Sequence, residues 1–430
     1  MANPRKSGDW VIHVNGVAKM QMASIVRLFL RREFQAAVLA IGLIAVSSGT
    51  TVGAAAGKPK VPPGFFPWQF PTSNALKTWK YQSFNTKRWW GDFPHNLVIP
   101  KHMFKKYSWA IGPFIKYAHN PVLSPTPGEW DCGHLGGGVH NGAIIFHHGI
   151  FYYIYRGERP YGPPVPYICD IGIATSPDGI HFKKLTTRHG LFRQGRFKRY
   201  SYEDVCVAKY HGTYYLFCNQ WYWKDQTDKK INGEFEATSR DLIHWKRLGI
   251  LFPHAHHVYR NGAVVVNPHN RAVRIDGKFV MYLDNGRMAY SRDMIHWKTA
   301  DNTIHFPGGE TCFALADYDA SNPNNIILFT GGNFTGNFYA IGEVLLSKKN
   351  LTRVISYLPK PVLAANPDIP YEHGFSATDP RKLVSTFADC IFFTGLTRHA
   401  GKWWIYYGGS EYYTCLATAP ARPAGVAVAP

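Results

Sequence analysis

Carboxylic acids stand at or near the starts of several apolar, strand-like segments between residues 119 and 419. Glycoside cleavage uses such groups: one carboxylic acid protonates the leaving oxygen, and a second carboxylate activates water or acts as the nucleophile. The pattern therefore favours chemistry on a glycosidic bond, provided that the fold brings distant carboxylates together. The candidate acids are Asp131, Glu203, Asp204, Glu310, Glu372, Asp389 and Glu411.

An internal repeat indicates the fold that could gather these acids. The unit Ser-x-Asp-x-x-His, followed by Phe or Trp, occurs in residues 174–184, 237–247 and 289–299, each time after a pair of apolar runs joined by a tight-turn signal. Weaker fourth and fifth copies follow. Repeats of about 50–70 residues with about four strands each are typical of propeller blades. We therefore predict an all-β, five-bladed β-propeller, in which the repeated unit is architectural: a tight turn whose aromatic residue packs between blades.

In a propeller the inner strand of each blade lines a central funnel, so functional side chains are expected on the first strand of each repeat. Glu203 and Asp204 are adjacent, and alternation along a strand predicts that only one of them faces the funnel. Glu310 opens the fourth blade and is the candidate base. The histidines around His257 lack a matching partner cluster, so we predict no metal site, and we predict no cofactor.

Four ordered motifs carry a family resemblance: Asn-Gly-Ala at 141–143, Tyr155-Arg156, Glu-Asp-Val-Cys at 203–206, and Tyr-Tyr-Gly-Gly-Ser-Glu at 406–411. This set, spread over about 300 residues, resembles glycoside hydrolase family 130, the mannoside phosphorylases and mannosidases. The resemblance implies a mannoside substrate, with Asp204 as the catalytic acid that delivers its proton through a sugar hydroxyl. The predicted substrate-binding residues are Asp131, Asn141, Arg156, His257, Arg260, Glu372, Asp389 and Glu411.

One departure from the family pattern decides between water and phosphate as the attacking group. The arginine that helps to hold phosphate in the phosphorylases would fall at Cys206, and a thiol cannot provide a bidentate, charged grip. Inverting hydrolysis of an oligosaccharide or polysaccharide, with Asp204 as acid and Glu310 as base, is therefore the leading prediction. The alternatives are a phosphorylase of the same family, an arabinanase- or invertase-like propeller using Asp131 and Glu310, and a non-catalytic carbohydrate-binding propeller.

The N-terminal region resembles an export signal. Arg31-Arg32 precede an apolar run and a small-residue segment, the order of a signal peptide, here of twin-arginine type. We predict a signal peptide over 1–56, an ordered arm over 57–118 and the propeller over 119–430, with an extracytoplasmic location and membrane contact only through an uncleaved leader. An odd count of seven cysteines argues against a complete disulfide framework, although Cys206 and Cys218 flank one hairpin and could bridge.

The chain is strongly basic, with a formal net charge of +20. Its Lys and Arg residues are scattered among turns rather than gathered in a recognisable nucleic-acid module, so nucleic acid is not a predicted partner. The charge suits acidic glycans or an anionic cell envelope, or it serves solubility alone.

Overall fold

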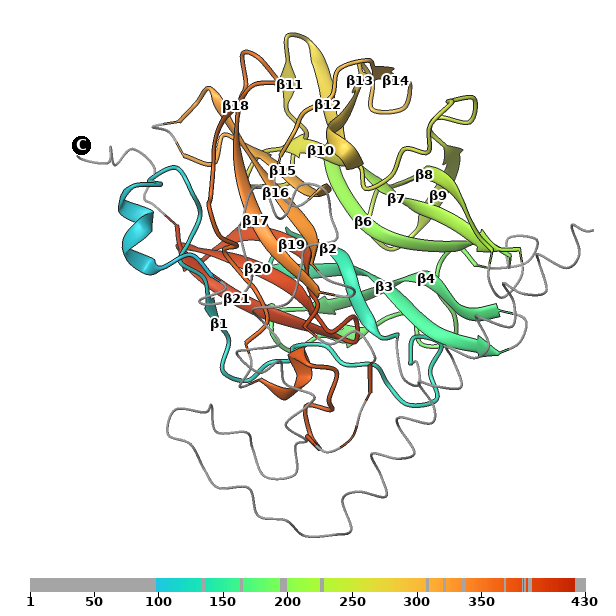
Figure 1. The fold of residues 1–430 in the computed structure, drawn as a ribbon. Helices are drawn as coiled ribbons and strands as arrows, with labels where there is room; N and C mark the ends of the chain where they lie inside the picture. Colours follow the sequence, from blue (N-terminus) through green and yellow to red (C-terminus); the bar gives the residue numbers. More distant parts are fainter. Residues whose placement is uncertain are drawn as a thin grey trace, which may run out of the picture. The chain divides into compact units, whose positions relative to one another are not determined.

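The described residues form three four-stranded antiparallel sheets and one nine-stranded sheet, which comprises two blades joined by a parallel strand pair, as seen in a computed structural model (Figure 1). Blades one and two keep the order of the sequence, β2-β3-β4-β5 and β6-β7-β8-β9, with the first strand innermost. The predicted five-bladed, all-β propeller is confirmed. The structure describes residues 98–421 apart from 133–136, 163–164, 194–198, 225–227, 307–308, 320–321, 335–337, 367–368, 381, 383 and 386–388. The predicted leader therefore lies outside the described residues.

The strand bounds follow the repeats. Blade one contains β2 (Val139–His147), β3 (Ile150–Gly162), β4 (Val165–Ser176) and β5 (Lys183–Lys184). Blade two contains β6 (Ser201–Tyr210), β7 (Thr213–Trp223), β8 (Lys229–Ser239) and β9 (Trp245–Ile250). Blade three contains β10 (Ala263–Val266), β12 (Lys278–Leu283), β13 (Arg287–Ser291) and β14 (Trp297–Ala300), and the short β11 (Arg274–Ile275) pairs with β12.

The remaining elements complete the ring. Blade four contains β15 (Gly309–Ala316), β16 (Asn325–Phe334), β17 (Phe338–Ser347) and β18 (Val354–Tyr357), and its inner strand β15 pairs in parallel with β10 of blade three. Blade five contains β19 (Ile391–His399), β20 (Lys402–Gly409) and β21 (Tyr413–Pro420). Three short 3-10 turns, η3 (Lys101–Lys105), η5 (Asp284–Gly286) and η6 (Pro370–Glu372), occur among the described residues.

Blade five is closed by a strand from the N-terminal side of the propeller. The strand β1 (Ile115–Lys116), which lies in the segment assigned to the arm, pairs antiparallel with β21. The Lys116 ammonium lies 2.6 Å from the Glu372 carboxylate. Mixing strands from both ends of the propeller in one sheet covers the edge of the last blade and holds the ring closed.

The hairpins that the sequence predicted are present. His148-Gly149 joins β2 to β3, and His211-Gly212 joins β6 to β7. All four residues have positive φ, between 45° and 79°, as a two-residue type I′ turn requires.

The repeated Ser-Asp-His unit is a hydrogen-bonded turn. In blade two, Ser239 Oγ accepts the N–H of Leu242 at 2.9 Å, and Asp241 accepts the N–H of His244 at 2.8 Å and lies 2.7 Å from its Nδ1. The other two copies have the same contacts. In the third copy, Trp297 packs edge-on against Phe217 of blade two. The architectural interpretation of the repeat is confirmed.

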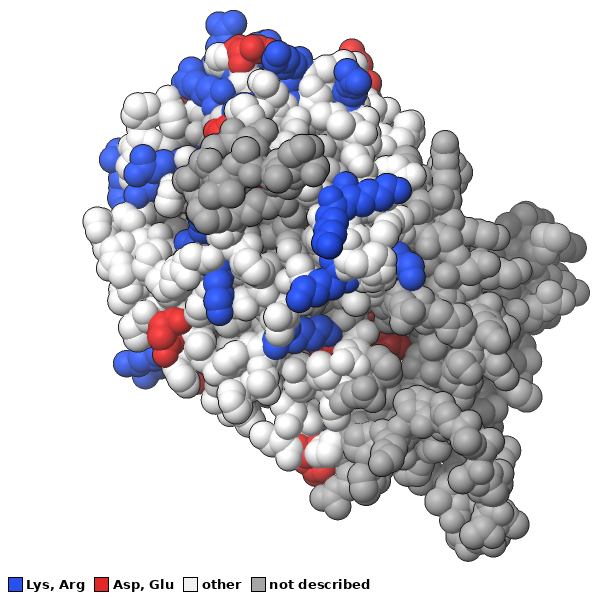
Figure 2. Space-filling view, turned by 90° about the vertical axis from the view of Figure 1, so that its left-hand side faces the viewer, with Lys and Arg blue, Asp and Glu red and all other residues white. Residues whose placement is uncertain are grey.

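The surface keeps the charge dispersed. On the face shown in Figure 2, Lys and Arg side chains lie in small separate groups with uncharged residues between them. Within the described part of the chain, no helix is long and apolar enough to cross a membrane. None of the seven cysteines, all of which are described residues, forms a disulfide, so Cys206 and Cys218 do not bridge.

Candidate active site

The inner strands break their regular pairing where they reach the funnel. The register shifts between His140 and Ala143 in β2, and between Glu203 and Cys206 in β6. Similar shifts occur in β15 and β19. The residues within the first two shifts, Asn141 and Asp204, have φ of 41° and 58°. A bulge adds a residue to one strand and redirects its side chain, and here it turns polar groups toward the axis.

All five blades contribute residues to one cavity on this axis. The expected convergence of the inner strands is thereby observed. The lining residues are Asn141 and Gly142 of blade one, Asp204, Val205 and Cys206 of blade two, Asn261 and Gly262 of blade three, Thr311 and Cys312 of blade four, and Phe392 and Phe393 of blade five.

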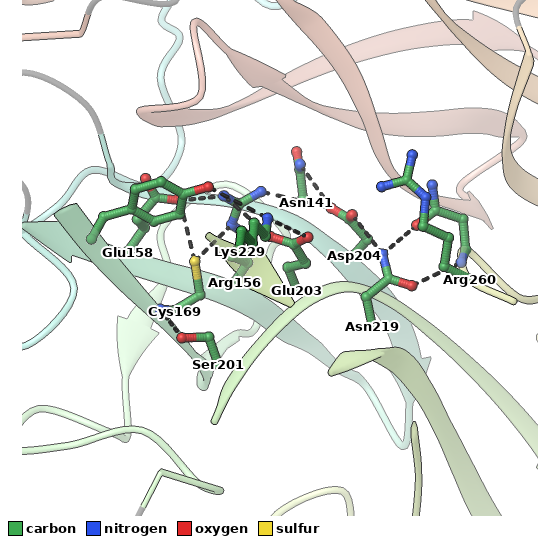
Figure 3. A network of polar contacts seen from close by, with 12 residues as sticks. Asn141, Arg156, Glu158, Cys169, Ser201, Glu203, Asp204, Asn219, Lys229 and Arg260 are labelled. Atoms are coloured by element: carbon green, nitrogen blue, oxygen red, sulfur yellow. Dashed lines mark hydrogen bonds and ion pairs between the residues drawn. The ribbon is translucent and has the colours of Figure 1, made fainter. Parts of the chain in front are cut away.

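Asp204 is held at this cavity by two neutral amides (Figure 3). Asn141 Nδ2 donates to one carboxylate oxygen and Asn219 Nδ2 to the other, each at 3.0 Å. The side chain is 15% exposed, so it is open toward the cavity but largely removed from bulk water. Burial, together with the neighbouring charge of Glu203, raises the pKa of Asp204, although Arg156 opposes the shift. A buried carboxyl that retains its proton is suited to act as an acid.

Glu203 reaches the same guanidinium as Asp204. Arg156 lies 3.5 Å from Glu203 and 3.8 Å from Asp204, and it also pairs with Glu158. Both acids approach one guanidinium because the bulge in β6 interrupts the alternation of the strand, but of the two only Asp204 lines the cavity, as predicted. Burial alone would raise the pKa of Glu203, but the cations Lys229 and Arg156 outweigh burial and lower it.

A second group of charges completes the cluster from blades three and four. Arg260 Nε lies 2.8 Å from Asp284, and Arg260 Nη2 lies 3.5 Å from Glu310. Asn261 links the two halves, because it accepts from Asn219 and donates to Asp284 at 3.1 Å. The polar network thus runs without a break from Asn141 through Asp204 to Asp284.

Three acids of the cluster hold their protons unusually tightly. Burial and the charge of Asp284 raise the pKa of Glu310 to about 8, against the effect of Arg260. Burial raises the pKa of Glu411 to about 7, although Arg156 opposes it. Burial also raises the pKa of Asp284 to about 6. Several carboxyls with pKa values near neutrality in one cluster form a set that can both donate and accept protons.

Two predicted binding residues lie outside this cluster with their charges already neutralised. Asp131 is fully buried, 2.9 Å from the ammonium of Lys184 and 2.7 Å from the Tyr155 hydroxyl. Glu372 is also fully buried and accepts from Lys116, from the Tyr407 hydroxyl and from a backbone N–H. Both acids tie structural elements together.

Two further predicted residues are also placed elsewhere. Asp389 is buried and bonds to His373, which in turn contacts a backbone carbonyl. His257 is exposed and lies edge-on to Tyr259, with ring centroids 6.5 Å apart. The structure therefore brings Asn141, Arg156, Arg260 and Glu411 to the two catalytic candidates, and leaves these other four residues apart. No group of three or more His, Cys, Asp or Glu side chains among the described residues is arranged to hold a metal ion.

The sequence analysis missed four members of the cluster. Glu158 and Asn219 lie within β3 and β7, the second strands of blades one and two. They pair with Cys169 of β4 and Glu203 of β6, respectively. Lys229 opens β8, and Asp284 follows β12. A polar residue inside an apolar run, such as Asn219 in YLFCNQ, was the available signal.

Comparisons with known proteins agree with this architecture. No protein-family model matches the chain. The chain is 25% identical over 307 residues to a 1,2-beta-oligomannan phosphorylase from Thermoanaerobacter sp. (strain X514), covering 69% of this chain and 93% of that protein. A beta-1,2-mannobiose phosphorylase from the same organism is 23% identical over 319 residues, covering 70% of this chain and 95% of that protein.

Solved structures share the fold. A glycosyl hydrolase from Bacteroides ovatus superposes with a TM-score of 0.59 at 23% identity, covering 76% of this chain and 97% of that one. A structure from work on GH130 glycoside hydrolases that target beta-1,2 mannosidic linkages in Candida mannan gives 0.57 at 24% identity, covering 76% and 98%. The resemblance to glycoside hydrolase family 130 indicated by the ordered motifs is thus confirmed in both sequence and fold.

Proposed function

We propose that the protein is a glycosidase that hydrolyses a β-mannosidic bond of an oligosaccharide with inversion at the anomeric carbon. The observation that carries the proposal is the meeting of Asp204 and Glu310, from blades two and four, in one charge cluster at the axial cavity. The relatives act on β-1,2-linked mannosides, as their names state, which supports a mannoside substrate.

The reaction needs one proton on the acid and none on the base. Asp204 gives its proton to the leaving glycosidic oxygen, through a sugar hydroxyl as the family resemblance implies, and the bond from that oxygen to the anomeric carbon breaks. A water molecule bonds to the anomeric carbon from the opposite face, and its proton passes to the carboxylate form of Glu310, which predominates above a pH of about 8. Glu411 is the second candidate for the base, because its pKa of about 7 leaves more carboxylate at neutral pH.

The sugar-binding role is proposed for the residues that share the cluster with the acid. Asn141, Arg156, Arg260 and Glu411 present amide, guanidinium and carboxylate groups near Asp204. Such groups hydrogen-bond to sugar hydroxyls and fix the orientation of the substrate. Because Asp131 is buried against Lys184 and Tyr155, the arabinanase- or invertase-like alternative is disfavoured.

The charge balance of the cluster favours water over phosphate. Its cations Arg156, Lys229 and Arg260 are each paired with carboxylates. A phosphate ion would therefore have to displace these carboxylates to reach a cation, whereas a neutral sugar would not. Cys206, where the resemblance places an arginine, lines the cavity as a thiol whose pKa burial raises to about 12.

Phosphorolysis is the second candidate, because the named sequence relatives are phosphorylases. The purified propeller would be incubated with β-linked mannose disaccharides of each linkage, with phosphate or with sulfate at equal ionic strength, and followed by proton NMR. We expect free mannose that appears first as the α-anomer, at a rate independent of phosphate. Phosphate-dependent formation of mannose 1-phosphate would overturn hydrolysis. Binding without turnover of any glycan would favour the carbohydrate-binding alternative.

We also propose export, from the Arg31-Arg32 motif and the apolar and small-residue segments that follow it. Expression of the full chain in a bacterial host, fractionation, and N-terminal sequencing of the protein outside the cytoplasm would test this. A mature end near Gly57 is expected. Retention in the cytoplasm, with Arg31-Arg32 replaced by Lys-Lys making no difference, would contradict export.

A further inference from the structure

Lys229, at the start of β8, is held in a fixed position beside the catalytic cluster. Its ammonium lies 4.0 Å from the ring centroid of Trp221 and 5.7 Å from that of Tyr167. Trp221 is fully buried, so its ring is a rigid support, and a cation over an aromatic face is attracted to it. Only 25% of the Lys229 side chain is exposed. These contacts distinguish Lys229 from a mobile surface lysine.

The fixed ammonium neutralises one of the two adjacent acids. Lys229 Nζ lies 3.3 Å from one oxygen of Glu203, and Arg156 lies 3.5 Å from the other. Both acids approach Arg156, which lies 3.8 Å from Asp204, but the second oxygen of Asp204 accepts from the neutral amide of Asn219, where Glu203 has the ammonium of Lys229. The two neighbouring carboxyls thus differ in the charge of their partners.

We propose that Lys229 is a positioning residue that keeps Glu203 as the anion of this pair, so that the proton of the pair remains on Asp204. Two carboxylates this close resist ionising together, and the one with the stronger cationic partner ionises first. Without the ammonium, Glu203 competes for the proton and Asp204 more often stands ionised, unable to protonate a leaving group. The inference rests on the proposed role of Asp204 as the acid.

Other charged groups face the pair and remain in place when Lys229 is replaced. They come from several elements: Arg156 and Glu158 from β3, Glu234 from β8, Arg260 and Asp284 from blade three, Glu310 from β15 and Glu411 from the turn after β20. Arg156, Arg260 and Glu411 interact with both carboxyls of the pair, and Glu234, Asp284 and Glu310 interact with Asp204, whereas the direct contact of Lys229 is with Glu203. Removal of Lys229 therefore changes mainly how the proton divides between Glu203 and Asp204.

A titration that needs no turnover tests this division. Protein labelled with carbon-13 at the aspartate carboxyl would be titrated by NMR, with the Asp204 signal assigned by its loss in Asp204→Asn. We expect Lys229→Met to lower the protonation midpoint of Asp204 by about one pH unit. Lys229→Arg, which keeps the charge, should restore it. The matched control is Lys230→Met, because Lys230 is half-exposed on the same strand and pairs with Asp228 at 2.8 Å. An unchanged or raised midpoint in Lys229→Met would overturn the inference.

A kinetic comparison then separates the inference from the proposed function. A β-linked mannose disaccharide needs a proton on its leaving oxygen, whereas a 2,4-dinitrophenyl mannoside leaves without one. We expect Lys229→Met to lower kcat on the disaccharide by about tenfold and to leave the dinitrophenyl rate within about twofold. Equal losses on both substrates would show a merely structural lysine. An Asp204→Asn variant as active as the parent on the disaccharide would instead refute the proposed function, and the titration would still report on Lys229.

Discussion

Blade two contains two aspartates whose pKa values are shifted in opposite directions, one in a surface turn and one in a strand bulge. Asp241 is 49% exposed in the repeated Ser-Asp-His turn. Its slight burial is outweighed by bonds from the His244 ring and from backbone N–H groups, which lower its pKa. Asp204 lies at the funnel bulge, where burial and Glu203 raise its pKa. The pKa of one residue type is therefore lowered at the surface, where hydrogen-bond donors surround the carboxylate, and raised at the axis, where the carboxyl is poorly solvated.

The difference extends to the blades as a whole. The surface turns are nearly identical in three blades, since each must solve the same problem of reversing the chain and covering its neighbour. The funnel residues are less uniform: Asn141-Gly142 of blade one recurs as Asn261-Gly262 in blade three, whereas blade two has Asp204-Val205 and blade four has Thr311-Cys312. The carboxylate of Asp204 is thus a departure from the pattern shared by blades one and three.

The largest expected effect is the difference in kcat between variants of Asp204 and Asp241. Asp204→Asn removes the acid while keeping the shape of the side chain, and should lower kcat on a mannose disaccharide by about 10²- to 10⁴-fold. Asp241→Asn, the matched control in the same blade, should leave kcat within about twofold. Steady-state kinetics of both variants, with circular dichroism to confirm folding, decide the point. Comparable losses in both variants would remove the distinction between surface turn and funnel.

The next largest expected effect is a difference between the funnel and the surface turn in how the free energy of unfolding depends on pH. The folded state holds a proton on Glu310 up to a pH of about 8, whereas the unfolded chain releases it near its ordinary pKa of 4.5. Folding therefore binds a proton in this window, and the contribution of Glu310 to stability is lost as pH rises through it. Glu310→Gln should be more stable than the parent at pH 9 by about 2 kcal/mol, below a ceiling of about 5 kcal/mol, with the difference vanishing near pH 4.

For the surface turn we expect the opposite change of stability with pH. The pKa of Asp241 is lowered in the folded state, so its contribution is present above the unfolded value of 3.8 and is lost as pH falls. Asp241→Asn should thus be less stable than the parent at pH 7, and this deficit should shrink in acid. Urea unfolding of the three proteins between about pH 2 and pH 9 measures both trends, because the contribution of Asp241 is lost only below its unfolded pKa of 3.8. Parallel pH profiles for the two variants would contradict the assignment of opposite environments.

Local signals made the fold predictable from sequence. The His-Gly turns require positive φ, and the Ser-Asp-His units form their hydrogen bonds within a few residues. The turns that bound the strands of these blades can therefore be recognised from short stretches of sequence. The funnel was harder because it depends on bulges. Alternation along a regular strand separates Glu203 from Asp204, and no local residue pattern announced the extra residue that brings both to Arg156.

Long-range partners account for the rest of the difference. Glu372 and Glu310 look alike in sequence, as acids near the beginnings of blades. Glu372 pairs with Lys116, which lies 256 residues away in the sequence, whereas Glu310 pairs with Arg260 in the charge cluster beside the cavity. Lys229 joins the cluster only because β8 lies two strands out from β6 in the same sheet. Such pairings follow from the assembled ring and cannot be read from the neighbours of a residue in the chain.

The smallest expected effect concerns the serine of the repeated Ser-Asp-His turn. Ser239 is buried, and its hydroxyl oxygen accepts the N–H groups of Asp241 and Leu242 at 3.1 and 2.9 Å. Ser239→Ala leaves these donors without that partner and should reduce the free energy of unfolding by about 1 kcal/mol, as for the loss of a helix cap. Ser291→Ala should act alike in blade three, since its contacts are the same. Urea unfolding measures the loss, and kcat should stay unchanged in both variants. A fall in kcat without a fall in stability would mean that these turns reach the site, and that repetition does not exclude a catalytic role.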